Sequence, residues 1–270
     1  MFTILEDNEN GKEIKMTYQN VIDLVKSTKE LVFSEEKLNA IQTKGYADFV
    51  TGVDLAVQTY LEAELSKFYP DVQFMGEEGE KSSLDFSGKI WVLDPIDGTS
   101  NLIHHLNLSA VSLALVENNE SVFGVVYNPF TDEIFTAEKG KGAYYNGKAI
   151  HVSDKKTMKE SFVSVGTSPY DADLREKSLG IIANLLRNCT DIRRLGAASL
   201  DLCYIAMGKF DCFYEEILRP WDYAAGAVII EEAGGKITDL DGNVLSYEKS
   251  RGILASNGCT HEELMKLVKI

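Results

Sequence analysis

Two aspartates, Asp94 and Asp97, lie in a short turn directly after an apolar run. The run, residues 90–93, has the length and composition of a buried strand, and Pro95 and Gly98 are expected to end it. Paired carboxylates suit a hard cation, above all Mg²⁺, because such ions prefer oxygen ligands. The turn therefore predicts a divalent-metal site. The alternative is a capped turn whose aspartates are only solvated.

The residues after this turn predict the start of a helix. Thr99, Ser100 and Asn101 are all good N-cap residues, and apolar Leu102 and Ile103 follow them. Backbone N–H groups at a helix start favour an anion, above all phosphate. A metal and a phosphate held side by side is the arrangement of a phosphoryl-transfer site.

Further acidic residues occupy comparable places in the chain. Glu77 follows a predicted strand at residues 72–75, and Asp222 lies in the first turn of a buried helix after Trp221. Each has an ordinary explanation as well, namely a solvated turn for Glu77 and a helix cap for Asp222. Ligands in such sheets gather at the carboxyl ends of strands, which favours a common site for these acids.

The segment at residues 44–54 is expected to be a turn-rich loop that leads into a helix ending at Pro70. It holds Lys44 and, in the first turn of the helix, Asp54. A carboxylate at that position is favoured by the helix dipole in any protein. The loop could also close over an active site.

The elements that must position these residues divide the chain into three parts. Residues 1–17 are expected to be an N-terminal arm. Residues 18–150 are expected to form an α+β domain with an antiparallel sheet and the metal-binding loops, and residues 151–270 an α/β domain that completes the site. Helices are predicted at 18–33, 57–68, 173–187, 198–207, 221–233 and 262–268. Strands are predicted at 72–75, 90–93, 108–116, 121–127, 133–137, 143–145, 162–166, 191–195, 210–215, 236–240 and 252–255.

The composition limits the possible partners. A net charge of −15 over 270 residues argues against nucleic acid or an anionic membrane as a partner. No apolar run approaches the roughly 20 residues of a spanning helix, and the polar N-terminus is not a signal peptide. The four cysteines form no CxxC pair, so we expect reduced thiols, no zinc site and a cytoplasmic protein.

The chain resembles the inositol monophosphatase family, within the lithium-sensitive, Mg²⁺-dependent phosphatase superfamily. Three motifs carry this resemblance in the family's order: Gly76-Glu77-Glu78, Asp94-Pro95-Ile96-Asp97-Gly98-Thr99, and Trp221-Asp222-Tyr223-Ala224-Ala225-Gly226. The loop with Lys44 and Asp54 and the segment at 196–199 are similar too. The resemblance covers residues 18–268 and implies a layered αβαβα sandwich of the sugar phosphatase type, of mixed α+β and α/β class.

The resemblance also implies a set of metal ligands. Glu77, Asp94 and the Ile96 carbonyl would bind a first Mg²⁺. Asp94, Asp97 and Asp222 would bind a second. Glu77 would reach a third ion partly through water, so the site would hold two or three Mg²⁺ ions.

The remaining roles follow from the same resemblance. Glu77 and Thr99 would orient the nucleophilic water, and Asp54 would polarise Thr99. The amides of Gly98 and Thr99 would hold the phosphate. The substrate hydroxyls would be lined by Asp97, Ala198, Glu215 and Asp222.

The expected activity is Mg²⁺-dependent hydrolysis of a small phosphorylated polyol, first of all inositol monophosphate, by direct attack of a metal-activated water. Fructose 1,6-bisphosphate, NADP and 3′-phosphoadenosine 5′-phosphate are the alternative substrates on the same scaffold, and Arg219 could favour a more anionic one. A homodimer is implied because many family members are homodimers. A haloacid-dehalogenase-type phosphatase fits less well, because two residues rather than one separate Asp94 from Asp97. A non-catalytic sugar-phosphate-binding regulator is a further alternative.

Overall fold

The structure is a computed structural model that describes residues 17–38, 40–45, 48–79 and 83–269. The expected arm at residues 1–17 lies outside this part except for Thr17. Thr17 begins the described chain as the N-cap of α1 (Tyr18–Ser27), where its side chain forms a capping box with Asn20.

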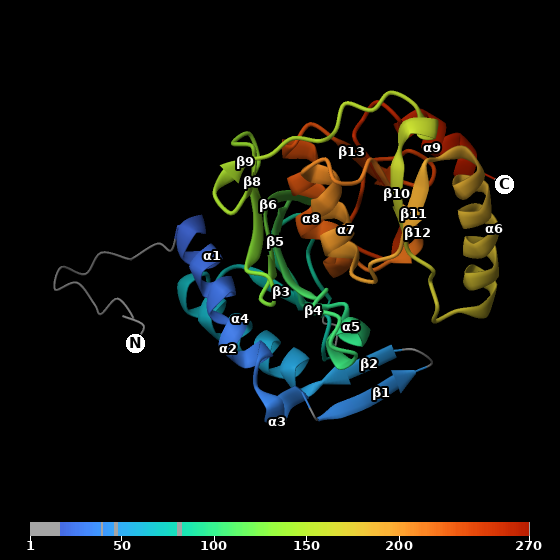
Figure 1. Cartoon of the computed structure of the whole chain (residues 1–270). Helices are drawn as coiled ribbons and strands as arrows, with labels where there is room; N and C mark the ends of the chain where they lie inside the picture. Colours follow the sequence, from blue (N-terminus) through green and yellow to red (C-terminus); the bar gives the residue numbers. More distant parts are fainter. Residues whose placement is uncertain (1–16, 39, 46–47, 80–82, 270) are drawn as a thin grey trace.

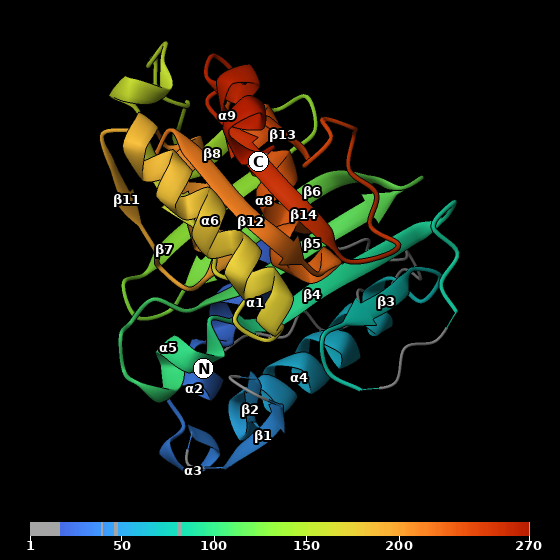
Figure 2. The ribbon, with the colours of Figure 1, turned by 90° about the vertical axis from the view of Figure 1, so that its right-hand side faces the viewer.

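Five layers alternate through the described molecule (Figures 1 and 2). Helices α1 and α4 (Gly52–Phe68) cover one face of a seven-stranded sheet. Helices α7 (Ala198–Ala206) and α8 (Pro220–Glu232) fill the space between that sheet and a five-stranded one. Helices α6 (Ala172–Asn188) and α9 (His261–Val268) cover the outer face of the smaller sheet. This arrangement confirms the expected αβαβα sandwich.

The larger sheet has the order β3-β4-β5-β6-β7-β8-β9, with β3 and β4 parallel and the remaining pairs antiparallel. Its strands are β3 (Gln73–Gly76), β4 (Lys89–Asp97), β5 (Ala110–Glu117), β6 (Glu120–Asn128), β7 (Glu133–Glu138), β8 (Ala143–Tyr145) and β9 (Lys148–Ala149).

Strand β4 is buried on both faces, as its continuous apolar run predicts. Trp91 and Leu93 pack toward α1 and α4, whereas Ile90 and Val92 pack toward α7 and α8. Successive side chains of a strand point to opposite faces, so a fully apolar strand can serve two layers at once. This places the carboxyl end of β4 at the junction of the layers.

The smaller sheet has the order β11-β10-β12-β14-β13, in which β11, β10 and β12 are parallel and β14 is antiparallel to both its neighbours. Its strands are β10 (Phe162–Val165), β11 (Asp191–Arg193), β12 (Cys212–Leu218), β13 (Lys236–Asp239) and β14 (Arg251–Ser256). A short 3₁₀ turn, η1 (Met158–Glu160), precedes β10. Strand β12 corresponds to the strand predicted at 210–215, but it starts two residues later and ends three residues later.

Two sequence expectations near the N-terminus were wrong. The single helix predicted at 18–33 is two helices, α1 and α2 (Lys29–Val32), because the chain leaves helical hydrogen bonding at Thr28. The segment expected to be a turn-rich loop is largely a hairpin of β1 (Ile41–Gly45) and β2 (Asp48–Thr51), preceded by α3 (Glu35–Leu38). The β1 residues are exposed, so no apolar alternation marked this strand.

The predicted boundary near residue 150 falls between the last strand of the larger sheet and the first of the smaller one. One core nevertheless joins the two parts, because Ile90 and Val92 share it with Leu202 and with Ile229 of α8. The division into two domains stays a prediction.

Two further expectations concern the cysteines and membrane-spanning helices. All four cysteines are free, as expected. Among the described helices, none has the length and apolar character needed to span a bilayer.

Candidate active site

The register of two parallel strands brings Glu77 to Asp94. Gly76, the last residue of β3, pairs with Leu93 of β4, and the Glu77 amide donates to the Leu93 carbonyl at 3.1 Å. The next residue of each strand therefore lies at the same carboxyl edge. The side chains of Glu77 and Asp94 come within hydrogen-bonding reach there.

A bulge places Asp97 on the same side of the sheet as Asp94. Strand β4 was expected to end at Pro95, but it continues to Asp97. Asp94 pairs with Ser112 and Asp97 with Ala110, so β4 contains one residue more than β5 over this stretch. In a regular strand, residues three apart face opposite sides, and the extra residue corrects this.

The Asp97 carboxylate sits at the start of α7. It accepts hydrogen bonds from the backbone N–H of Ser199, at 2.7 Å, and from the Ser199 hydroxyl. Residues 102 positions apart in the chain are thus joined, and the positive end of the α7 dipole stabilises the Asp97 charge.

The helix after the turn, α5 (Thr99–Ile103), has Gly98 as its N-cap, in place of the predicted Thr99, Ser100 or Asn101. Gly98 has φ +84°, and an added Cβ would lie 3.1 Å from the Ala197 Cβ at the α7 start. The position therefore requires glycine on both grounds. It lets the starts of α5 and α7 approach each other.

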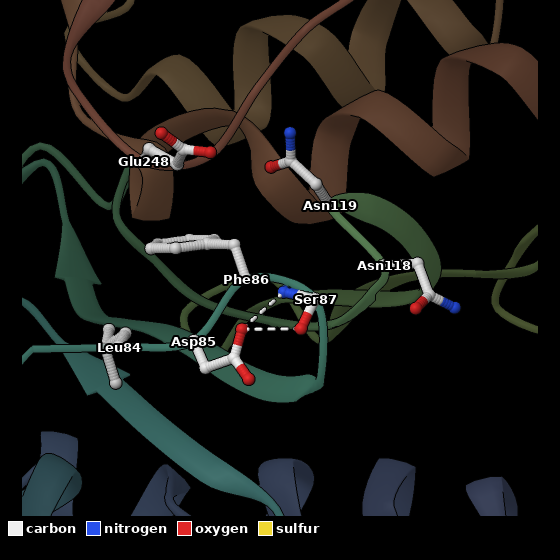
Figure 3. Close-up of a pocket in the computed structure, with 7 residues that line it drawn as sticks. All are labelled: Leu84, Asp85, Phe86, Ser87, Asn118, Asn119 and Glu248. Carbon is white, nitrogen blue, oxygen red and sulfur yellow. Dashed lines mark hydrogen bonds between the residues drawn. The ribbon is translucent and has the colours of Figure 1, made fainter.

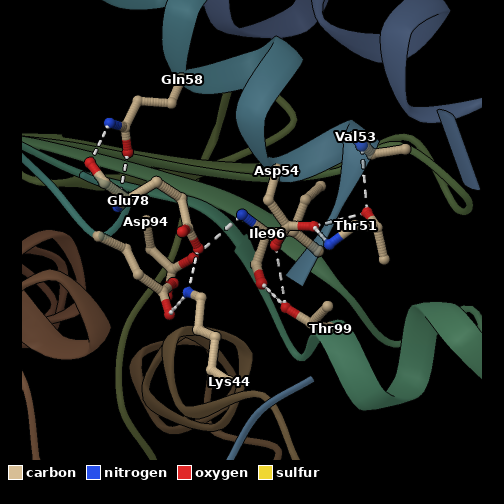
Figure 4. Close-up of polar contacts among 10 residues, drawn as sticks. Lys44, Thr51, Val53, Asp54, Gln58, Glu78, Asp94, Ile96 and Thr99 are labelled. Carbon is tan, nitrogen blue, oxygen red and sulfur yellow. Dashed lines mark hydrogen bonds and ion pairs between the residues drawn. The ribbon is translucent and has the colours of Figure 1, made fainter. Parts of the chain in front are cut away.

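Asp54 and Thr99 form a polar contact beside these acids (Figure 4). One Asp54 oxygen accepts the amide and hydroxyl of Thr51 at the N-terminus of α4, at 2.8 and 2.6 Å. Its other oxygen accepts from the Thr99 hydroxyl at 3.1 Å, and that hydroxyl also lies 3.0 Å from the Ile96 carbonyl. The capping box fixes Asp54, and Asp54 in turn orients Thr99.

Asp222 reaches the cluster from α8. It is the third residue of the helix, and one of its oxygens accepts the Arg219 amide at 2.7 Å. It interacts electrostatically with Asp97 and Glu77. The Arg219 guanidinium lies 5.7 Å from the Trp221 ring centre.

Glu215 lies on β12, where its carboxylate accepts from the Ser168 amide at 3.3 Å. A Cβ on Gly166 would overlap that carboxylate, so only glycine leaves room for it. Arg194 is the cation whose charge acts on Glu215, and Ala198 is buried at the first position of α7.

Burial dominates the electrostatics of the cluster. It raises the pKa of Asp94 well above its ordinary range, and the charges of Glu77, Asp97 and Asp222 raise it further. Burial raises the pKa of Glu77 to about 7 against the opposing effect of Lys44, and that of Asp97 to about 6 against its hydrogen bonds from Ser199. Acids this close and this buried favour a bound cation or proton.

Comparison with known proteins decides the family. The sequence matches the model of the inositol monophosphatase family over residues 11–270. The chain belongs to the inositol monophosphatase family. The match begins seven residues before the expected start at residue 18, so part of the segment predicted as an N-terminal arm is within it.

The relatives of this inositol monophosphatase family member cover most of its length. An inositol-1-monophosphatase from Rhizobium meliloti is 39% identical over 237 residues, which are 88% of this chain and 87% of that protein. A fructose-1,6-bisphosphatase/inositol-1-monophosphatase from Thermotoga maritima is 38% identical over 230 residues, 85% of this chain and 86% of that protein. The extragenic suppressor protein suhB from Bartonella henselae superimposes with a TM-score of 0.85 at 33% identity, covering 92% of this chain and 96% of that one.

Membership makes the protein a phosphoric monoester hydrolase, and the inositol monophosphatase family is generally Mg²⁺-dependent. As the side chains stand, no three His, Cys, Asp or Glu residues of the described chain are arranged to hold a metal ion. Hydrogen bonds already engage one oxygen each of Asp94, Asp97 and Asp222, and Lys44 pairs with Glu77.

Three residues that support the site were given no role from the sequence, although Thr51 and Ser199 lie in segments that carry the resemblance. Thr51 was detectable, because Thr51 and Asp54 have the spacing of a capping box. Ser199 and Gln58 were not, since their partners are distant in sequence. Gln58 holds the backbone of Glu78 through two amide hydrogen bonds of 2.6 and 2.9 Å.

A separate surface pocket of about 650 Å³ lies at the opposite end of β4 (Figure 3). It is lined by Leu84, Asp85, Phe86, Ser87, the turn of Asn118 and Asn119, and Glu248. None of the predicted site residues belongs to it.

Proposed function

We propose that the protein hydrolyses a phosphate monoester of a small polyol, first of all inositol monophosphate, by direct attack of a metal-activated water. One observation carries this proposal. Four acids from separate parts of the chain, Glu77, Asp94, Asp97 and Asp222, interact electrostatically at one place, beside the Asp54–Thr99 contact.

The donor set fits Mg²⁺. All four side chains offer carboxylate oxygens, which Mg²⁺ prefers, and their mutual repulsion in a buried place is relieved by a cation. Glu77, Asp94 and the Ile96 carbonyl would hold one ion, and Asp94, Asp97 and Asp222 a second. Glu77 would reach a third through water. When bound, such ions make hydroxide available near neutral pH and stabilise the leaving alkoxide.

Asp54 and Thr99 would position the attacking water together with Glu77. The Asp54 carboxylate accepts a hydrogen bond from the Thr99 hydroxyl, so the lone pairs of the Thr99 oxygen are free to accept one from water. A water that donates to this oxygen is held in one orientation. Orientation of the nucleophile is a large part of catalysis in phosphoryl transfer.

The substrate would lie between the two helix starts. The Gly98 and Thr99 amides would hold the phosphate, since first-turn amides lack partners within their helix. Asp97, Ala198, Glu215 and Asp222 would line the hydroxyls of the leaving group.

Replacement of Gly166 by alanine tests the role of Glu215. The added methyl takes the place of the Glu215 carboxylate, so we expect KM for inositol monophosphate to rise by about tenfold, as after loss of a hydrogen bond to a charged group. Mg²⁺ affinity should not change. Gly180→Ala, on the exposed part of α6, is the matched control. An unchanged KM in Gly166→Ala would remove Glu215 from the substrate contacts.

The substrate is tested by phosphate release from a panel of inositol phosphates, fructose 1,6-bisphosphate, NADP and 3′-phosphoadenosine 5′-phosphate. We expect the highest kcat/KM with an inositol monophosphate, dependence on Mg²⁺ and inhibition by Li⁺. The combined name of the Thermotoga relative makes fructose 1,6-bisphosphate the first alternative. Background release from every compound would favour a non-catalytic regulator instead.

Direct attack by water predicts inversion of configuration at phosphorus, because one in-line displacement takes place. A chiral phosphate ester measures this outcome. Retention of configuration, or an aspartyl-phosphate trapped by borohydride, would indicate a covalent intermediate and contradict the proposed mechanism.

Light scattering tests the proposed homodimer. The cytoplasmic location, and the expected absence of nucleic-acid and membrane partners, stay predictions.

A further inference from the structure

Lys44 places a positive charge among the acids of the site. Its Nζ lies 3.5 Å from a Glu77 oxygen and contacts the Glu78 carboxylate (Figure 4). The Lys44 side chain is 29% exposed and that of Glu78 only 8%, so the ammonium remains partly in contact with water while the Glu78 carboxylate is largely buried.

The ammonium therefore lies beside a Glu77 oxygen that a bound cation would also use. Two positive charges in contact with one carboxylate repel each other, and the effective dielectric of a protein surface weakens this repulsion without removing it. A divalent ion on Glu77 and an ammonium in contact with the same carboxylate are thus poorly compatible.

Strand β1, which carries Lys44, can move without disrupting the five-stranded or the seven-stranded sheet. Lys44 lies on β1, which pairs with β2 in a two-stranded sheet of its own. Glu78 is a well-positioned partner for the ammonium, because the Gln58 side chain, from α4, makes two hydrogen bonds with the Glu78 backbone.

We propose that Lys44 is a built-in counter-ion for Glu77 that competes with a divalent cation for this carboxylate and gives up its contact with Glu77, but not that with Glu78, once the cation is bound. The inference rests on the proposed function, since it takes Glu77 as a metal ligand. Two consequences follow by linkage. Removal of the Lys44 charge strengthens metal binding, and metal binding releases Lys44 from Glu77.

Calorimetric titration of the full-length protein with Mg²⁺ tests the first consequence. We expect Lys44→Met to bind Mg²⁺ about tenfold more tightly than the wild type. Lys67→Met is the matched control, because it removes the same charge from an exposed pair with Glu64 on α4. Equal or weaker binding by Lys44→Met would overturn the proposal.

Chemical acetylation read by mass spectrometry tests the second consequence in the wild-type protein. We expect Mg²⁺ to raise the labelling rate of Lys44 severalfold and to leave that of Lys67 unchanged. Slower or unchanged labelling of Lys44 would contradict the release.

Mg²⁺ titration of the wild type separates the proposed metal site from the proposed competition. A wild-type protein that binds no Mg²⁺ would refute the metal site itself and, with it, the proposed function. A wild type that binds Mg²⁺ with an affinity indifferent to Lys44 would refute only the competition.

Discussion

Asp94→Asn is expected to lower kcat by at least about 10³-fold at saturating Mg²⁺ while the fold persists. Asp94 is the acid assigned to both principal metal positions, so its loss weakens both. Asparagine has the same shape and still accepts the Ile96 amide, which Asp94 binds at 3.0 Å. Steady-state kinetics together with circular dichroism measure the two parts of this expectation.

The same variant should melt no lower than the wild type without metal. Asp94 is only 2% exposed and is surrounded by other acids, so a neutral side chain relieves repulsion there. Unchanged or higher stability together with a loss of activity is typical of substitutions in catalytic sites. Asp241→Asn, at an exposed aspartate, is the charge-matched control. Near-normal kcat in Asp94→Asn would reject the assigned role.

Mg²⁺ is expected to stabilise the protein much more at pH 8.5 than at pH 6.5. Burial raises the pKa of two of the proposed metal ligands in the folded protein, that of Glu77 to about 7 from the ordinary 4.5 and that of Asp97 to about 6 from the ordinary 3.8. The folded state therefore retains protons that the unfolded state has lost. The associated stability is complete below about pH 4 and is lost as the pH rises through 7.

The stabilisation that Mg²⁺ provides increases with pH, because Mg²⁺ binds the carboxylate and not the protonated acid. At 100 times its Kd, Mg²⁺ contributes about 2.7 kcal/mol, or roughly 5–8 °C in Tm for a chain of this size. We expect this shift at pH 8.5 and a clearly smaller one at pH 6.5, with the EDTA-treated protein less stable at the higher pH.

Two choices isolate this effect. The buried His261 has its pKa lowered to about 4, from 6.5, so it is neutral in the folded protein at both pH values. K⁺ at matched ionic strength replaces Mg²⁺ in the control. Equal Mg²⁺ shifts at the two pH values would show that the raised pKa values do not belong to the metal-binding groups.

Much of the fold was predictable because its strands and helices carry strong local patterns. The apolar run of β4 and the apolar helix α8, which Gly234 and Gly235 follow, indicated buried elements, and both lie where expected. The β1–β2 hairpin was missed, because β1 is exposed along its length and lies in a two-stranded sheet of its own, although Val50 and Thr51 of β2 are buried. No alternation of apolar and polar residues distinguished β1 from a loop.

The candidate acids could be identified without a structure, since carboxylate side chains at strand ends and helix starts follow from residue type and local pattern alone. That these acids lie together depends on long-range packing. The Gly76–Leu93 register sets Glu77 beside Asp94, the bulge turns Asp97 to the same face, and the two helix starts bring Ser199 and Asp222 to it. These contacts join residues up to about 145 positions apart, and such distant pairing depends on how whole layers pack rather than on any local preference of the chain.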